Sequence, residues 1–197
     1  MSKGRQTRQT ILKQALELST EVGLEGLTVG VLARKVGMSK SGLYAHFASK
    51  EDLQSQVLDV AAEHFVEVVI VPALKEPRGI PRLQALFERW LDWATENLSG
   101  GCPFISAAAE FDDRSGPVRD TLVAHKHNVL ETIARAIRIC IQEGHISGIL
   151  DVDQITFEIW GLLLAHHHYA RLMHRKDARD RAVQALQRLL EQAKKDR

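Results

Sequence analysis

The residues best suited to recognise another molecule lie in the first quarter of the chain, between Thr28 and Lys50. Two short helical stretches flank Val36-Gly37-Met38-Ser39, and a turn of three or four residues containing glycine between two helices is the helix-turn-helix arrangement. The second stretch has a small and polar outer face that can approach the major groove of DNA closely. The predicted DNA contacts are Thr28, Ser39, Lys40, Ser41, Gly42, Tyr44, His46 and Lys50.

Net charge supports this interpretation only slightly. The whole chain has a formal net charge of +1, but residues 1–50 contain eight Lys and Arg side chains against three Asp and Glu side chains. A basic segment on a mildly acidic remainder is typical of a protein that binds a polyanion. The same imbalance also lies within ordinary surface variation, so a three-helix structural module without a DNA-binding role stays open.

A second group of side chains could line a pocket for a small molecule. Most of the large aromatic rings beyond residue 80 fall on three predicted helices, and a helical bundle can enclose a mostly apolar pocket. The candidate pocket residues are Phe87, Trp90, Trp93, Phe104, Phe111, Phe157, Trp160 and His168. For each ring taken singly, an ordinary place in the core is the simpler explanation. Few charges interrupt these stretches, which favours a largely apolar or aromatic occupant.

Histidines and cysteines give no metal or cofactor signature, so none is expected. Neighbouring residues on a helix point about 100° apart, so His166, His167 and His168 cannot ligate one ion together. Cys102 precedes Pro103 at a predicted helix start, where a thiolate is stabilised. A redox switch and an ordinary buried residue both remain open there. Two cysteines make no disulfide framework, which fits a reduced, cytoplasmic protein.

Known catalytic motifs are absent from the sequence, so we do not expect an enzyme. The chain contains no G-x-S-x-G, P-loop, G-x-G-x-x-G or H-E-x-x-H pattern. The acidic cluster Glu110, Asp112 and Asp113 could bind a cation, although a solvated helix end explains it more simply. The alternative function is therefore an all-helical enzyme or scaffold with a cation or small-molecule site in the C-terminal bundle.

The hydrophobic pattern predicts an all-α protein of about nine helices, because its period is helical almost throughout. The predicted helices cover about residues 7–22, 28–36, 39–47, 50–71, 81–98, 103–111, 117–144, 151–174 and 177–195. Pro72 and a loop at 75–81 separate a helix-turn-helix domain at 1–50 from a larger helical domain at 72–197, and the fourth helix links them. No run of about 20 apolar residues and no secretory leader occurs, so neither a membrane span nor a membrane partner is expected.

The eighth predicted helix, 151–174, is apolar nearly all round and must be covered on more than one side. Gly161 and Ala165 lie four residues apart on it and permit close contact between helices. We therefore expect a homodimer through this helix and the ninth, 177–195. The alternative is a central helix buried entirely within one chain.

Residues 27–53 strongly resemble the DNA-binding head of the TetR/AcrR-type transcriptional regulators. The shared positions are Thr28, Leu32-Ala33, Gly37, Ser39, Leu43-Tyr44, His46-Phe47, and Ser49-Lys50-Glu51 leading to Leu53. The resemblance covers about residues 7–65, and beyond them only the all-helical layout is similar. One departure is the order Ser41-Gly42, because the family commonly has glycine first, and this leaves the operator sequence unpredictable.

The resemblance implies a dimeric regulator whose two heads read an inverted repeat in double-stranded DNA. A small-molecule effector held among the aromatic residues would release it from this palindromic operator, so a repressor is expected, while activation stays open. The implied start of the recognition helix is Lys40, Ser41 and Gly42. The implied phosphate contacts are Thr28, Tyr44, His46 and Lys50, whereas Leu43 and Phe47 are implied core residues.

Overall fold

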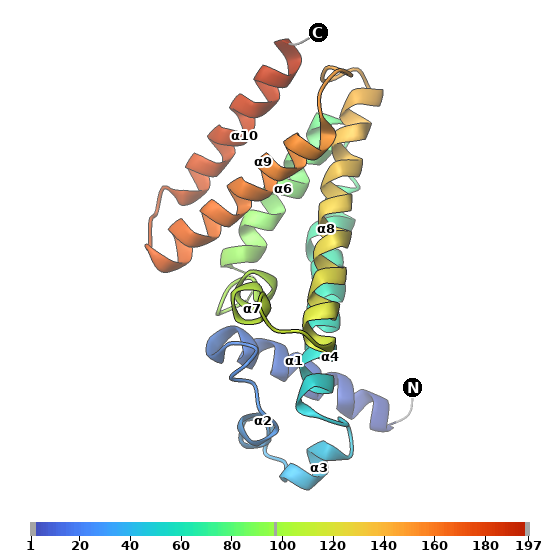
Figure 1. Cartoon of the computed structure of the whole chain (residues 1–197), viewed down its shortest axis with the longest axis vertical. Helices are drawn as coiled ribbons and strands as arrows, with labels where there is room; N and C mark the ends of the chain where they lie inside the picture. Colours follow the sequence, from blue (N-terminus) through green and yellow to red (C-terminus); the bar gives the residue numbers. More distant parts are fainter. Residues whose placement is uncertain (1–2, 97, 196–197) are drawn as a thin grey trace. The chain divides into compact units, whose positions relative to one another are not determined.

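The computed structural model describes residues 3–96 and 98–195, and all regular secondary structure within those ranges is helical (Figure 1). The predicted all-α fold is therefore confirmed. The elements are α1 Lys3–Val22, α2 Val29–Val36, α3 Lys40–Tyr44, α4 Lys50–Phe65, η1 Val66–Ile70, α5 Val71–Ala73, α6 Ile80–Thr95, α7 Pro103–Phe111, α8 Pro117–Gln142, α9 Val152–His167, η2 His168–Leu172 and α10 Ala178–Lys195. None of the described helices combines the length and the apolar character that crossing a bilayer requires.

Two compact units make up the chain, and each joins segments that lie far apart in the sequence. The head unit combines Met1–His64 with Leu98–Lys126, and the body unit combines Phe65–Asn97 with His127–Arg197. Helices α4 and α8 therefore each contribute residues to both units. The sequence-based domains, 1–50 and 72–197, are continuous segments instead, and their independence stays a prediction.

Within the head unit, α2 packs against both α1 and α3. Leu16, Leu32, Leu43 and Phe47 are buried in the core that these helices share, so the predicted core positions of Leu43 and Phe47 are confirmed. The guanidinium of Arg8 on α1 lies 5.8 Å from the centre of the Phe47 ring and adds a cation–π contact to this core. The first three helices thus form a small packed module that orients α3.

Helix α3 is shorter than predicted, because it ends at Tyr44 and not near residue 47. The start of α4 explains the difference. The Ser49 hydroxyl accepts a hydrogen bond from the N–H of Asp52 (3.0 Å), and the Asp52 carboxylate accepts one from the N–H of Ala48 (2.9 Å). This reciprocal capping box commits the chain to begin α4 at Lys50, so the residues before it must turn out of α3.

Helix α7 holds the end of α1. The Glu110 carboxylate accepts hydrogen bonds from the backbone N–H groups of Leu24 (3.2 Å) and Glu25 (2.6 Å), which follow α1. Gly23 has a φ of 79°, and a Cβ there would lie 2.7 Å from an oxygen of Glu110, so only glycine suits this close approach. Glu110 is therefore an acceptor for the backbone.

Among the described residues, no group of three or more acidic, His or Cys side chains is placed to hold a metal ion.

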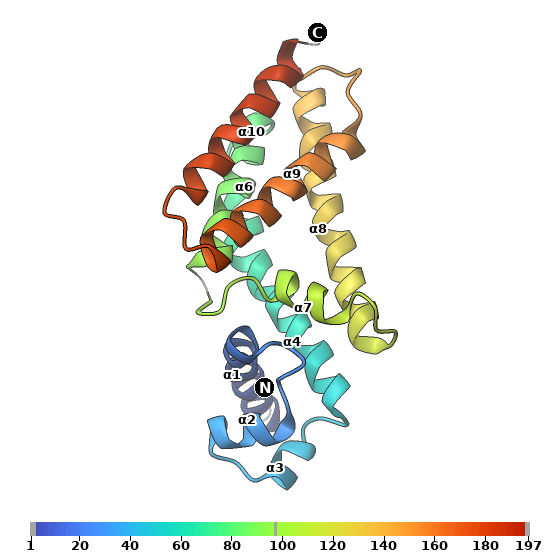
Figure 2. The same ribbon diagram turned by 60° about the vertical axis from the view of Figure 1, so that its left-hand side comes forward.

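Within the body unit, α9 packs against α6 and α10, and α9 and α10 run side by side in both views (Figure 2). The largest fully buried side chains of this unit come from three helices, and they include Trp93 of α6, Ile137 of α8 and Ile159 of α9. Side chains from separate helices therefore meet in one apolar interior, where a pocket of the predicted kind can form.

The helical path beyond α4 contains one π-helical turn, η1, just before Pro72. There the N–H of Val71 donates to the carbonyl oxygen of Val66, five residues earlier. Proline lacks an N–H, and its ring clashes with the carbonyl four residues before it in an α-helix, so a wider turn relieves the conflict. The helical path consequently reaches Ala73, beyond the predicted end at 71. A second π-helical turn, η2, replaces the end of the predicted helix 151–174.

Candidate DNA interface and internal cavity

Three local signals build the turn between α2 and α3. Thr28 caps α2, because its hydroxyl accepts a hydrogen bond from the N–H of Val31 (3.2 Å). Gly37 ends α2 at a φ of 67°, a left-handed conformation that glycine adopts without strain. Ser39 caps α3 by accepting a hydrogen bond from the N–H of Gly42 (3.1 Å). These hydroxyls fix the helix ends, and the two amides that they bind are already satisfied within the chain.

The outer surface of α3 is polar and open. Lys40 and Ser41 are exposed, and 57% of Tyr44 is accessible to solvent, whereas Leu43 between them is fully buried. His46 lies in the turn after α3 and is half-buried. The structure therefore brings three of the predicted DNA contacts together on one exposed face, and it places His46 beside that face in the chain.

Lys50 differs from the other predicted contacts because it already has an anionic partner. Its Nζ atom lies 3.0 Å from one oxygen of Glu25, and Arg114 lies 3.1 Å from the other oxygen. The hydrogen bond from Lys50 is the main cause that lowers the pKa of the Glu25 carboxyl. A phosphate contact by Lys50 would exchange one anion for another. Sequence reasoning missed Glu25 and Arg114, because nothing in their spacing indicates that these segments meet.

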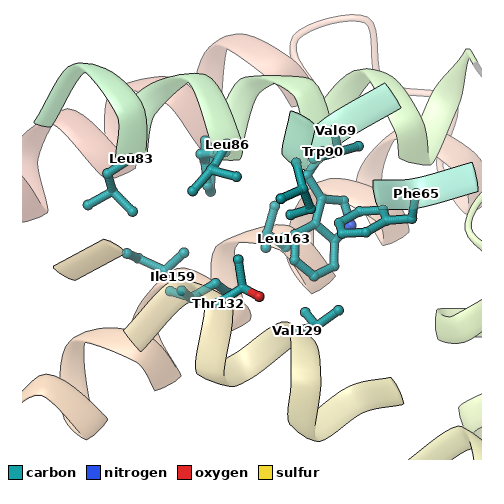
Figure 3. Close-up of a pocket in the computed structure, with 12 residues that line it drawn as sticks. Phe65, Val69, Leu83, Leu86, Trp90, Val129, Thr132, Ile159 and Leu163 are labelled. Atoms are coloured by element: carbon teal, nitrogen blue, oxygen red, sulfur yellow. The ribbon is translucent and has the colours of Figure 1, made fainter. Parts of the chain in front are cut away.

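The body unit encloses a cavity walled by α4, η1, α6, α8 and α9 (Figure 3). The centre of a water molecule can occupy only about 20 Å³ of it, so the surrounding side chains nearly fill the space. No charged residue lines it, and its polar side-chain atoms belong to Trp90 and Thr132. The surface of the cavity is therefore almost entirely apolar, and Trp90 and Thr132 are the lining residues with a polar side-chain atom.

Two of the eight predicted pocket residues, Phe87 and Trp90, line this cavity. Trp93 does not line it but lies next to it, fully buried with its ring centre 5.5 Å from that of Phe65. Trp160 contacts Trp90 at 5.4 Å between ring centres, but it lines an open groove between α8 and α9. Phe157 lines the same groove and is 70% exposed.

The other three predicted pocket residues do not line the cavity either. Phe104 and Phe111 belong to α7 in the head unit, where the Phe104 ring lies 5.8 Å from that of His125. His168 is exposed at the start of η2, and its neighbour His166 is the buried member of the histidine run. The aromatic residue types indicate hydrophobic positions in the sequence. They do not show which face of each helix carries the ring.

Sequence reasoning missed most of the cavity wall, which is largely aliphatic. Phe65, Val69 and Ile70 come from the end of α4 and from η1. The missed residues on α6, α8 and α9 are Leu83, Leu86, Val129, Thr132, Ile133, Ile159 and Leu163. Several of these belong to periodic apolar stripes in the sequence, but the same stripes describe an ordinary core, so they could not distinguish a cavity.

His166 is buried on α9, and its Nδ1 atom has no hydrogen-bond partner among the described residues. Burial lowers the pKa of this imidazole, and the charge of Arg179 on α10 lowers it further, against the opposing effect of Asp92 on α6. His166 is therefore uncharged in the folded protein at neutral pH.

We expect the protein to lose stability as the pH falls below about 6.5, the ordinary pKa of histidine. In that range the unfolded chain gains a proton at His166 that the folded chain does not accept, which favours unfolding. Replacing His166 by leucine should remove this part of the pH dependence. Thermal unfolding between roughly pH 5 and 7.5 measures it, with His127→Leu, at an exposed imidazole, as the control. An unchanged pH dependence in His166→Leu would contradict the prediction.

An apolar stripe is exposed on α9 and η2. Phe157 and Leu172 are 70% and 69% exposed, and Leu164 between them is also exposed. Their spacing of seven and eight residues places them on one side of the helical path. We call these three residues the α9 stripe. Large exposed apolar side chains along one helix face make this stripe a candidate interaction surface.

Comparison with known proteins gives matches to both halves of the chain. A family model for bacterial regulatory proteins of the tetR family matches residues 11–57, and one for the tetracyclin repressor-like C-terminal domain matches residues 79–186. The HTH-type transcriptional regulator SrpR of Pseudomonas putida is 27% identical over 159 residues, which are 80% of this chain and 72% of SrpR. The tetracycline repressor protein class C of Escherichia coli is 39% identical over 61 residues, 31% of this chain and 26% of the repressor.

A solved structure agrees with both matches. A TetR transcriptional regulator from Chloroflexus aurantiacus J-10-FL superposes with a TM-score of 0.86 at 28% identity, covering 94% of each chain. The first family match contains the α2–α3 turn, and the second spans more than half of the chain and contains most of the cavity wall. The chain belongs to the TetR family and is a ligand-responsive transcriptional regulator with a DNA-binding N-terminal domain and a ligand-binding C-terminal domain.

Proposed function

We propose that this regulator is a homodimeric repressor, which binds a palindromic operator and leaves it when a small, largely apolar effector occupies the body cavity. The observation that carries the proposal is the exposed face of α3, formed by Lys40, Ser41 and Tyr44 over the buried Leu43. Side chains of this size and polarity can reach base edges and phosphates in the major groove. The remaining proposed DNA contacts are Thr28, Ser39, Gly42, His46 and Lys50.

A second copy of the chain is the proposed partner of the α9 stripe. One head contacts only a few base pairs, so two heads are needed to read an inverted repeat. An interface of α9 and α10 would bury Phe157, Leu164 and Leu172, which the single chain leaves in water. The exposed Gly161 on the same side of α9 has open space around it, which would let a partner helix approach closely.

The proposed effector acts by linkage. A ligand shifts a conformational equilibrium only if it binds one state more tightly than the other. Because the cavity is nearly filled, an occupant must move lining side chains such as Val69 of η1, the turn that directly follows Phe65. Phe65 ends the same helix that begins at Lys50, which pairs with Glu25 in the turn before α2. We propose that α4 carries the displacement from the cavity wall to the DNA-binding helices.

We further propose that the protein acts by binding and not by catalysis, in the cytoplasm and without a cofactor. Its family consists of transcriptional regulators. The alternative is an enzyme or scaffold with a cation or small-molecule site, and its cation site depends on the acidic cluster that includes Glu110. The Glu110 carboxylate accepts hydrogen bonds from two backbone N–H groups, so its oxygens already have partners within the chain and a cation would have to compete with them.

Selection of bound duplexes from a random DNA pool tests the proposal directly. At about physiological salt, specific sites outlast non-specific ones, so an inverted repeat with fixed spacing is the expected result. The selected duplex then serves as the probe for compounds that release the protein. Weak binding without enrichment, which disappears as salt rises, would contradict a specific dimeric reader.

Replacing Lys40 by alanine will weaken binding of the dimer to the selected operator by at least about tenfold and will reduce the slope of log affinity against log salt by about two units, because each of the two heads loses one cation. The reason is that Lys40 is exposed at the start of α3, so its loss removes one cation from the DNA-facing surface. Fluorescence anisotropy over a range of salt concentrations measures both effects. The matched control is Lys13→Ala, at an exposed lysine of α1. Equal losses in the two variants would contradict a specific role for Lys40.

A further inference from the structure

We propose that the effector is an uncharged molecule with a hydrogen-bond acceptor, a carbonyl or hydroxyl oxygen, that binds the indole N–H of Trp90. This inference rests on the proposed function, because it takes the body cavity as the effector site. It goes further by naming the chemical class of the effector and the side chain that selects this class.

Trp90 has an unused donor inside the cavity wall. The residue is only 6% exposed, and its Nε1 atom has no hydrogen-bond partner among the described residues. A buried indole N–H usually donates to an acceptor. A conformation in which the N–H has no acceptor is less stable for that reason. Figure 3 shows the Trp90 indole among Phe65, Leu163 and Val129, whose side chains contain no acceptor atom. An acceptor on the ligand would therefore supply the partner that the Trp90 indole N–H lacks.

Two neighbouring rings hold this indole in place. The ring centre of Phe65 lies 5.0 Å away at an interplanar angle of 70°, and that of Trp160 lies 5.4 Å away at 59°. A side chain packed on two sides loses little freedom when a ligand binds, so its N–H direction is set in advance. A site with such a fixed buried donor rejects analogues that lack the acceptor.

The rest of the wall excludes charge. Thr132 supplies the other polar side-chain atom, and its hydroxyl already donates to the carbonyl oxygen of Asn128 (2.8 Å). Thr132 can therefore only accept a further hydrogen bond. An ionised ligand would be buried here without a counter-charge, which is strongly unfavourable. The pattern favours a neutral ketone or alcohol over a hydrocarbon, which cannot satisfy Trp90, and over a carboxylate or an ammonium ion.

Titration calorimetry with ethylbenzene, acetophenone and benzoate tests this selectivity with probes of similar size. The wild-type protein should bind acetophenone about tenfold more tightly than ethylbenzene, and benzoate at least about 100-fold more weakly than acetophenone. The Trp90→Phe variant keeps an aromatic ring but loses the N–H, so its preference for acetophenone should fall to within about twofold. Thr132→Val, a change of similar shape, should retain the preference.

An unchanged preference in Trp90→Phe, tight binding of benzoate, or no binding of any probe would overturn the inference. Nitrogen-15 NMR of the wild-type protein avoids dependence on the folding of a variant. Acetophenone should move the Nε1–H proton resonance of Trp90, one of three tryptophans in the chain, downfield as hydrogen bonding does, whereas ethylbenzene should not produce this downfield shift. If acetophenone binds with the expected preference but leaves the operator complex intact, the chemical class stands and the proposed effector role of the cavity fails.

Discussion

Replacing Leu164 by glutamate will convert the protein to a monomer and lower its affinity for the operator at least about 100-fold. Leu164 is the middle residue of the α9 stripe, so the new carboxylate would be buried between the two copies without a partner. A monomer has one head, whereas linking two heads raises the apparent affinity by roughly 10²- to 10⁴-fold. Sedimentation velocity gives the oligomeric state, and anisotropy on the selected duplex gives the affinity.

Leu74→Glu is the matched control for this experiment. Leu74 is an exposed leucine at the end of α5, so it receives the same chemical change away from α9. It should remain dimeric and bind the operator as the wild-type protein does. A Leu164→Glu protein that stays dimeric would contradict the α9 interface, and a monomer with full operator affinity would show that one head is sufficient.

Replacing Glu110 by alanine will lower the free energy of unfolding by about 2 kcal/mol, because the variant leaves two backbone donors without their acceptor. The donors are the N–H groups of Leu24 and Glu25, and Leu24 is itself buried, so water can replace the carboxylate only in part. Urea denaturation measures the loss. Faster hydrogen exchange at the Leu24 and Glu25 amides should accompany it, because these amides lose their protection.

Asp113→Ala provides the comparison for Glu110→Ala. Asp113 is an exposed carboxylate just beyond the same helix, and its removal leaves the hydrogen bonds to Leu24 and Glu25 in place. Its stability should stay within about 0.5 kcal/mol of the wild type, as is usual for surface substitutions. Equal losses in the two variants would mean that the Glu110 hydrogen bonds contribute nothing beyond general surface charge.

Most of the fold could be predicted from the sequence, because the signals that start and stop its helices are local. Gly37 and the caps Thr28 and Ser39 lie within a few residues of the turn that they build. Asp151 likewise caps α9 with a local signal, since its carboxylate accepts hydrogen bonds from the N–H groups at 153 and 154. The observed helix ends differ from the predicted ones where two local signals compete. At Pro72, the proline favours a helix end while the apolar residues before it favour a continued helix, and the π-helical turn η1 results.

The candidate site was less predictable, because it depends on contacts between distant segments. The pairing of Lys50 with Glu25 and the capture of the α1 end by Glu110 have no local signature. The cavity wall mixes α4, α6, α8 and α9, and its membership depends on how far each helix is rotated about its axis. Aromatic content selected Phe87 and Trp90, which line the cavity, together with Phe157, which is 70% exposed, because the size of a ring does not show which way its side chain points.

The division of the head unit into two segments affects the order in which a growing chain can mature. Translation proceeds from the N-terminus, and domains generally fold as their residues emerge. The amides of Leu24 and Glu25 cannot form these hydrogen bonds until Glu110 has been translated, 85 residues after Glu25. A nascent or prematurely terminated chain that contains α1 to α4 therefore lacks the contact that anchors its first helix. The head unit is thus complete only after the first segment of the body unit, Phe65–Asn97, has been synthesised.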